Sequence, residues 1–134
     1  MEDDRMIGQI LSLSLQRGKY RVLLADCGAE AMEIAGRYPN GIDVIVTDVL
    51  LGKEEGPVIA GVVRQFSPDA MLLLISGYPL EILYDKNILR PQYLEDGKAT
   101  FLQKPFLSNT FVEIVNDMLA AGSGEGDKHA SAAY

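Results

Sequence analysis

Five side chains in this sequence could form one chemical site: Glu2, Asp3, Asp48, Ser76 and Lys104. Carboxylates that are not accompanied by histidine or cysteine are hard oxygen ligands, which Mg²⁺ prefers. An ionised aspartate is also a nucleophile that can take a phosphoryl group as an acyl phosphate. A metal ion and Lys104 would stabilise the charge on that group, and Ser76 would hydrogen-bond one of its oxygens. These residue types therefore point to phosphoryl chemistry assisted by a divalent cation.

Three of these residues, Asp48, Ser76 and Lys104, end or directly follow an apolar segment. The segments are IDVIVT at 42–47, AMLLLIS at 70–76 and TFLQ at 100–103. Short, nearly continuous apolar runs are typical of strands that are buried on both faces of a parallel sheet. Ligands of such sheets bind at the carboxyl ends of the strands. We therefore expect the three side chains to meet at one edge of the sheet.

The remaining segments alternate with these strands as helices should in an α/β protein. Apolar spacing predicts helices at 4–17, at 29–38, from Pro57 onward and at 108–120. It predicts one more strand at 20–25. The region 79–97 is expected to be a loop with at most one broken helix. The segment 52–56 is expected to be a polar loop. The alternation predicts a doubly wound parallel sheet with helices on both faces.

Length and composition exclude several classes of protein. The chain has 134 residues, a formal net charge of −7 and a single cysteine, Cys27. The length suggests one domain, at 1–120, and we expect 121–134 to be a disordered tail because it lacks core-forming residues. An acidic surface repels nucleic acid, and no apolar run is long enough to span a membrane. No leader is visible, so we expect a cytoplasmic protein.

Each candidate residue also has a plain structural interpretation. Asp48 could be an ordinary loop carboxylate paired with Lys104, and Ser76 could be a turn residue. The acidic start of the chain could simply complement the dipole of the first helix. Three strand ends with complementary chemistry favour a site over three coincidences.

Four motifs in this order resemble those of the receiver domain of two-component response regulators, in particular the receivers attached to hybrid histidine kinases. The motifs are EDD at the start, VIVTDVLL, LLLISGYP and FLQKPF, and the resemblance covers residues 2–120. It implies a flavodoxin-like α/β/α fold in which the sheet has the strand order 2-1-3-4-5. It also implies a protein that takes phosphate from a histidine kinase or histidine phosphotransfer protein and then acts on a downstream protein.

The resemblance assigns roles to individual residues. Asp48 is similar to the phosphoacceptor, Asp3 to a direct Mg²⁺ ligand and Glu2 to a ligand that acts through water. The backbone carbonyl of Leu50 would be a further metal contact. The register that places Ile7, Leu11 and Leu15 on the buried side of the first helix selects Glu2 and Asp3 as the acidic pair.

Four further roles follow from the same resemblance. Ser76 and Lys104 would bind the phosphoryl group, and Ser76 would move with it as a switch residue. Phe101 would be the aromatic switch residue, although plain core packing also explains its type. Pro105 follows Lys104 in a peptide bond that is cis in the family.

Two features depart from the family. The sequence as given begins at the acidic pair, so we expect the sheet to lack its first, central strand. Gly52 stands in the loop where the family usually has a proline. These departures keep open a pseudo-receiver that binds partners without phosphorylation.

A third hypothesis is a hydrolase of the haloacid-dehalogenase kind, which needs a second aspartate where Leu50 stands. The favoured function is a Mg²⁺-dependent phosphoacceptor rather than a turnover enzyme. The sequence does not identify its kinase or output, and it leaves open whether the protein forms a homodimer.

Overall fold

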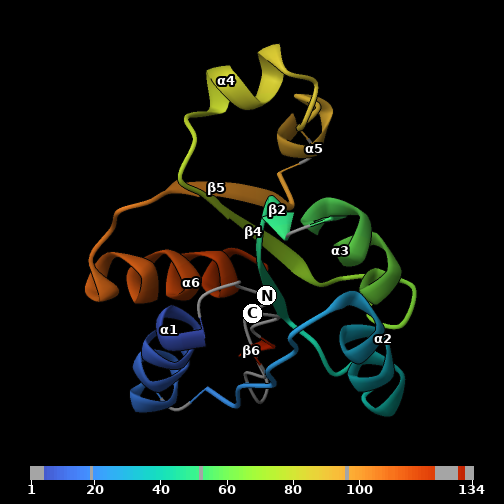
Figure 1. The fold of residues 1–134 in the computed structure, drawn as a ribbon. Helices are drawn as coiled ribbons and strands as arrows, with labels where there is room; N and C mark the ends of the chain where they lie inside the picture. Colours follow the sequence, from blue (N-terminus) through green and yellow to red (C-terminus); the bar gives the residue numbers. More distant parts are fainter. Residues whose placement is uncertain (1–4, 19, 52, 96, 123–129, 132–134) are drawn as a thin grey trace.

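Four parallel strands form the main sheet of the computed structural model (Figure 1). The structure describes residues 5–18, 20–51, 53–95, 97–122 and 130–131. Within these ranges the strands are β1 (Val44–Asp48), β4 (Met71–Ser76), β5 (Ala99–Gln103) and β6 (Ala130–Ser131). Their order across the sheet is β5-β4-β1-β6.

The two central strands are buried on both faces, as their apolar sequences predict. All five residues of β1 are buried, and β1 pairs with β4 along its whole length. Because side chains alternate across a strand, Ile45 packs into one core cluster while Val44 and Val46 pack into the other. The sheet therefore separates two cores, which need helices on both faces.

Two pairs of helices supply these outer layers (Figure 1). On one face lie α1 (Arg5–Arg17) and α6 (Ser108–Gly122), and on the other lie α2 (Gly28–Arg37) and α3 (Gly56–Arg64). Each pair packs its apolar stripe on the sheet: the stripes include Leu11, Leu15, Phe111 and Val115 on the first face, and Ala31, Ala35, Ile59 and Val63 on the second. The predicted three-layer α/β/α architecture is confirmed.

The polar segment after β1 differs from the expected loop. Leu50–Leu51 (β2) and Glu54–Glu55 (β3) form a short antiparallel pair, in which Leu50 lies opposite Glu55. The predicted helix follows at once, with Pro57 in its first turn, where a missing backbone N–H costs nothing. The hairpin thus returns the chain directly from the end of β1 to the start of α3.

The prediction of a strand at 20–25 is wrong, because this segment lies in no helix or strand of the structure. A strand exists only where a neighbour completes its hydrogen-bonded ladder. In the described part of the sheet the neighbour of β1 on the side away from β4 is β6. The composition of 20–25 is that of a strand, but it has no ladder in the described part of the chain.

The region 79–97 contains two short helices rather than at most one broken helix. They are α4 (Leu80–Asp85) and α5 (Gln92–Glu95). Asn87, with a φ of 55°, adopts the left-handed conformation that stops a helix. Pro91 then precedes the second helix, and both helices lie beyond the β5 edge of the sheet (Figure 1).

The expected disordered tail needs correction in its described part. Helix α6 continues to Gly122, and Ala130–Ser131 forms a strand parallel to β1. The other residues of 121–134 lie outside the described part of the chain. The two strand residues lack large apolar side chains, so composition could not reveal that their backbone pairs with the sheet.

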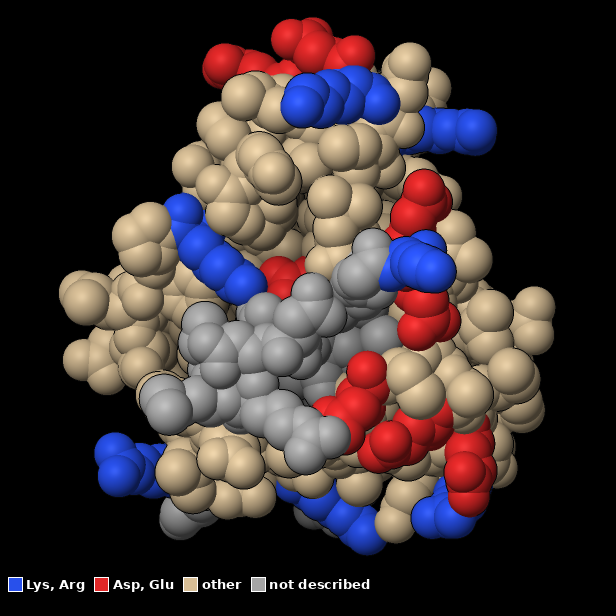
Figure 2. Space-filling model, viewed as in Figure 1, with Lys and Arg blue, Asp and Glu red and all other residues tan. Residues whose placement is uncertain are grey.

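Acidic side chains gather over α2 and the neighbouring start of α3, on the face shown in Figure 2. In this region the Glu54 carboxylate accepts a hydrogen bond from the backbone N–H of Gly28, at 3.2 Å. A carboxylate there also complements the positive end of the α2 dipole. Among the described residues, no helix combines the length and apolar character needed to cross a membrane.

Candidate functional site

Asp48 is the last residue of β1 and is buried, with 6% of its surface exposed. It lies opposite Ile75 of β4, and the next backbone N–H, that of Val49, donates to the Ile75 carbonyl at 2.9 Å. The ladder therefore continues one step past the aspartate. The backbone is therefore bound to β4 both before and after Asp48, which fixes the position of the carboxylate.

Lys104 brings a positive charge to this carboxylate from the end of β5. Its Nζ lies 3.1 Å from Oδ1 of Asp48 and 3.4 Å from Oδ2. Its backbone N–H donates to the Ser76 carbonyl at 2.8 Å, which anchors the residue to β4. The Lys104–Pro105 peptide bond is cis, as the resemblance implied. The predicted meeting of the strand ends is confirmed for this pair.

Ser76 ends β4 and lies beside the same pair of charges. The three predicted residues Asp48, Ser76 and Lys104 line one open cavity of about 190 Å³. The Ser76 hydroxyl accepts a hydrogen bond from the backbone N–H of Tyr78, at 3.0 Å. A hydroxyl that accepts this bond still carries one proton that it can donate, as a phosphoryl-binding hydroxyl needs.

Two residues near the aspartate were missed from the sequence. Tyr78 lines the cavity, and Gly56 lies so close to the end of β1 that an added Cβ would come within 1.9 Å of the Asp48 carbonyl oxygen. That oxygen also accepts a hydrogen bond from the Thr47 hydroxyl, at 3.0 Å. The only sequence signal for Gly56 was its place before Pro57, which marks a helix start but not this close approach.

The predicted metal ligands are only partly within the described residues. Glu2 and Asp3 lie outside them, whereas Asp48 and Leu50 both line the cavity. In the described ranges no three acidic, histidine or cysteine side chains cluster as metal ligands. Mg²⁺ keeps several waters and is bound through one or two carboxylates, so the Asp48 carboxylate is a donor of the right kind.

Phe101 lies in the middle of β5, opposite Leu74 of β4. Its ring is partly buried and packs against the core cluster on the α2 and α3 side of the sheet. This is the contact that core packing predicts. A role as a switch residue stays a prediction, because the structure shows one position of the ring.

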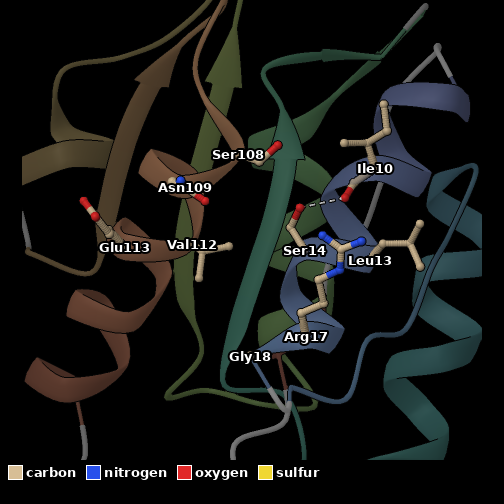
Figure 3. Close-up of a pocket in the computed structure, with 9 residues that line it drawn as sticks. All are labelled: Ile10, Leu13, Ser14, Arg17, Gly18, Ser108, Asn109, Val112 and Glu113. Atoms are coloured by element: carbon tan, nitrogen blue, oxygen red, sulfur yellow. Dashed lines mark hydrogen bonds between the residues drawn. The ribbon is translucent and has the colours of Figure 1, made fainter.

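A larger hollow lies between α1 and α6, as Figure 3 shows. Its volume is about 580 Å³, and it includes two exposed apolar side chains of α1, Ile10 and Leu13, with 48% and 55% of their surfaces exposed. A smaller hollow of about 270 Å³ shares Ile10 and Ser108 with it and extends to Lys104 and Pro105. An apolar surface thus runs from the side of Lys104 along α1. We call these two hollows the α1–α6 groove.

Comparison with known proteins places this site in a family. The chain is 32% identical to the sensor kinase CckA of Brucella abortus (strain 2308) over 106 residues, which are 79% of this chain and 11% of that protein. It is 27% identical over 120 residues to the response regulator receiver protein CpdR of the same strain, covering 90% of this chain and 93% of the relative. The match to a two-component response regulator of Oryza sativa subsp. japonica covers 54% of that protein. The chain therefore spans about a tenth of the sensor kinase and about half of the plant regulator.

Solved structures show the same fold. The receiver domain of the hybrid histidine kinase CckA matches with a TM-score of 0.70 and 28% identity, over 88% of this chain and 94% of that one. A response regulator receiver protein from Sinorhizobium medicae WSM419 matches with a TM-score of 0.70 and 23% identity, over 91% and 92%. The family described as the response regulator receiver domain matches residues 1–116. The chain therefore belongs to the response regulator receiver domain family of two-component signalling.

Proposed function

We propose that this receiver domain accepts a phosphoryl group on the carboxylate of Asp48. The supporting observation is the Lys104 ammonium 3.1 Å from Oδ1 of a buried aspartate that opens into a cavity. Burial limits competition from water, and the fixed positive charge favours the ionised, nucleophilic carboxylate. A carboxylate that served only to pair with lysine would not need a cavity beside it.

In the proposed step a carboxylate oxygen of Asp48 attacks the phosphorus of a phosphohistidine. The new P–O bond forms as the P–N bond breaks, and the leaving imidazole keeps the electron pair and takes a proton. Negative charge develops on the phosphoryl oxygens, where the Lys104 ammonium and the Ser76 hydroxyl can stabilise it. The product is an acyl phosphate, formed once per transfer, so the domain acts as an acceptor rather than a turnover enzyme.

The phosphoryl group would then change the contacts at the ends of β4 and β5. Ser76 now accepts a hydrogen bond from the Tyr78 backbone and could turn its proton toward the new oxygens. Lys104 would divide its charge between Asp48 and the phosphoryl group. We place the conformational response at Ser76 and at Phe101 on β5, whose partly buried ring packs on the α2 and α3 side of the sheet.

We further propose that Mg²⁺ assists the transfer. Asp48 and the backbone carbonyl of Leu50 are its proposed ligands in the described part, and Glu2 and Asp3 are the proposed remaining ones. When bound, the ion would neutralise charge on the phosphoryl oxygens. Removal of Mg²⁺ by a chelator should therefore abolish phosphate uptake without unfolding the domain.

Phosphorylation by acetyl phosphate with Mg²⁺, followed by intact mass measurement, tests the function. The native chain should gain the mass of one phosphoryl group, and Asp48→Asn should gain none. Asp69→Asn is the matched control, because Asp69 is exposed in the turn before β4, at the opposite end of the strand from Ser76, and its replacement should leave uptake unchanged. Equal uptake by the native chain and Asp48→Asn would overturn the assignment of the acceptor.

A pseudo-receiver is the second candidate. The observation that favours it is Gly52, which stands in the loop after Asp48 where the family usually has a proline. A phosphate analogue such as beryllofluoride separates the two candidates. A Mg²⁺-dependent spectral change that Asp48→Asn lacks supports the phosphoacceptor, while identical responses of both proteins support the pseudo-receiver.

The α1–α6 groove is the proposed docking site of the phosphodonor, a histidine kinase or histidine phosphotransfer protein in the cytoplasm. The groove reaches Lys104, so a helix that packs on Ile10 and Leu13 would bring a side chain close to the phosphate site. Amphipathic helices bind such apolar grooves through regularly spaced side chains. A downstream protein would then bind the phosphorylated form of the domain.

A further inference from the structure

Within the described residues, the strand that carries Asp48 shares a longer ladder with β4 than with β6. Toward β4 it pairs along all five residues, and toward β6 the pairing covers Val44 and Ile45. Both faces of β1 are buried. Because unpaired backbone groups in a buried strand are costly, the pairing with β6 matters for the strand that holds the acceptor.

Hydrogen bonds at the two ends of β1 show which backbone groups point to which edge. The Asp43 carbonyl accepts from Met71 at 2.8 Å, and the Val49 N–H donates to Ile75 at 2.9 Å. Both partners belong to β4. In a parallel ladder the N–H and C=O of one residue point to the same edge, and successive residues alternate. Ile45 and Thr47 therefore point toward β4.

The same alternation turns Val44, Val46 and Asp48 toward the β6 edge. In the observed register Ala130 lies opposite Val44 and Ser131 opposite Ile45. In a parallel pair, a residue bonds to the two neighbours of the residue opposite it. The backbone of Ser131 therefore faces β1 and lies between Val44 and Val46. The backbone of Ala130 points away from β1, toward the outer side of the sheet.

We propose that the C-terminal strand acts as an intramolecular clasp on the edge of β1 and thereby helps to position Asp48. Helix α6 makes this geometry possible, because it leaves β5, crosses the sheet beside α1 and ends at Gly122 (Figure 1). The edge of the sheet next to β1, opposite β4, is where β6 pairs. The clasp faces Val44 and Val46, four and two residues before the acceptor, on the edge to which the Asp48 backbone also points.

Proline substitution tests the clasp at two adjacent positions. Ser131→Pro removes an N–H that faces β1, whereas Ala130→Pro removes one that faces outward, where an edge strand tolerates proline. Amide hydrogen exchange of the full chain, followed by NMR, measures the effect. Ser131→Pro should speed exchange at Val44 and Val46 by about tenfold, the equivalent of one lost hydrogen bond.

The exchange of Ile45 and Thr47 is the internal control, because their amides point toward β4. Their rates should change far less than those of Val44 and Val46. Ser131→Val should act in the opposite sense to proline and slow exchange at Val46, since valine favours strands. The inference is overturned if Ser131→Pro and Ala130→Pro behave alike, or if all four amides accelerate equally.

The pairing must also occur within one molecule. Mass determination by light scattering across a range of concentrations should show a monomer whose Val46 exchange does not depend on concentration. A dimer whose Val46 protection rises with concentration would show that the strand comes from a second copy, and would overturn the intramolecular clasp.

The link to Asp48 rests on the proposed function and has a separate readout. Ser131→Pro should take up phosphate from acetyl phosphate and Mg²⁺ about tenfold more slowly than Ala130→Pro, since small displacements of reacting groups are costly. If the native chain takes up no phosphate, the proposed function fails while the exchange comparison still decides the clasp. Normal uptake by a Ser131→Pro variant with fast Val46 exchange would overturn the link alone.

Discussion

The Nζ of Lys104 lies 3.1 Å from Oδ1 of Asp48, although 56 positions separate the two residues in the chain. The parallel sheet explains the contact, because β1 and β5 flank β4 and all three end at the same edge. The side chain of Asp48 is 9% exposed and that of Lys104 is 24% exposed, so solvent screens the pair only in part.

Lys104→Met should weaken both the fold and the chemistry. It keeps most of the apolar stem but removes the charge beside a buried carboxylate, so the free energy of unfolding should fall by about 1–3 kcal/mol. Phosphate uptake from acetyl phosphate should fall by about 10²-fold or more, as when one stabilising donor is removed. Urea titration and intact mass measure the two effects. Lys86→Met, at an exposed helix end, is the control, and equal behaviour of the two variants would contradict the prediction.

Gly56→Ala should be strongly destabilising, by about 3 kcal/mol, because its Cβ would overlap the Asp48 carbonyl oxygen and force the backbone to shift. Gly61→Ala, in the same helix, is the matched control. Nothing lies within 4 Å of a Cβ at Gly61, so alanine there should stabilise the protein by about 0.5–1 kcal/mol. Urea unfolding of both variants measures the contrast. Similar stabilities of the two variants would show that the close approach at Gly56 is not rigid.

Tyr20→Phe should change how stability depends on pH. Burial raises the pKa of the Tyr20 phenol above its ordinary value of 10.0, and its hydroxyl donates to Asn116. The folded state thus keeps this proton at a pH where the unfolded state loses it. Its contribution to stability is complete below pH 10 and declines as pH rises through the folded-state pKa.

The measured quantity is the difference in free energy of unfolding between the native chain and Tyr20→Phe. It should be about 0.5–1.5 kcal/mol near pH 7, the usual net value of one hydrogen bond, and should shrink above about pH 10. Urea titrations at a series of pH values give this difference directly. A difference that stays constant up to the highest pH would contradict the predicted role of the buried phenol.

Leu13→Glu should separate docking from chemistry. Leu13 is exposed in the α1–α6 groove, so its replacement should change stability by no more than about 0.5 kcal/mol. Transfer from a histidine phosphotransfer protein should slow by about tenfold, while uptake from acetyl phosphate should stay normal. Val58→Glu, equally exposed on α3, is the control and should affect neither. A loss of both reactions in Leu13→Glu would show damage to the site rather than to docking.

The strand ends are where prediction from the sequence was most accurate. Apolar runs such as 42–47 and 70–76 have only one stable place, inside a sheet covered on both faces, and this places Asp48 and Ser76 at one edge. Lys104, which follows the strand at 100–103 and precedes Pro105, was predicted at the same edge. The helices with clear apolar stripes were equally predictable, because their burial depends on local spacing.

Segments whose structure depends on a distant partner were predicted less well. The segment 20–25 has the composition of a strand, but no ladder is present for it in the described part of the chain. Ala130–Ser131 has the composition of a tail, yet it pairs with β1. In both cases the backbone decides, and backbone pairing leaves little trace in side-chain composition.

The sequence by itself determined the fold class and the placement of Asp48, Ser76 and Lys104 at the ends of strands. Residue type and apolar periodicity are sufficient for both, because burial follows directly from them. Only the tertiary structure decided the 3.1 Å contact of Lys104 with Asp48, the close approach of Gly56 and the strand that covers the outer edge of β1. These features depend on backbone register and on packing between distant segments, which no local pattern of residues records.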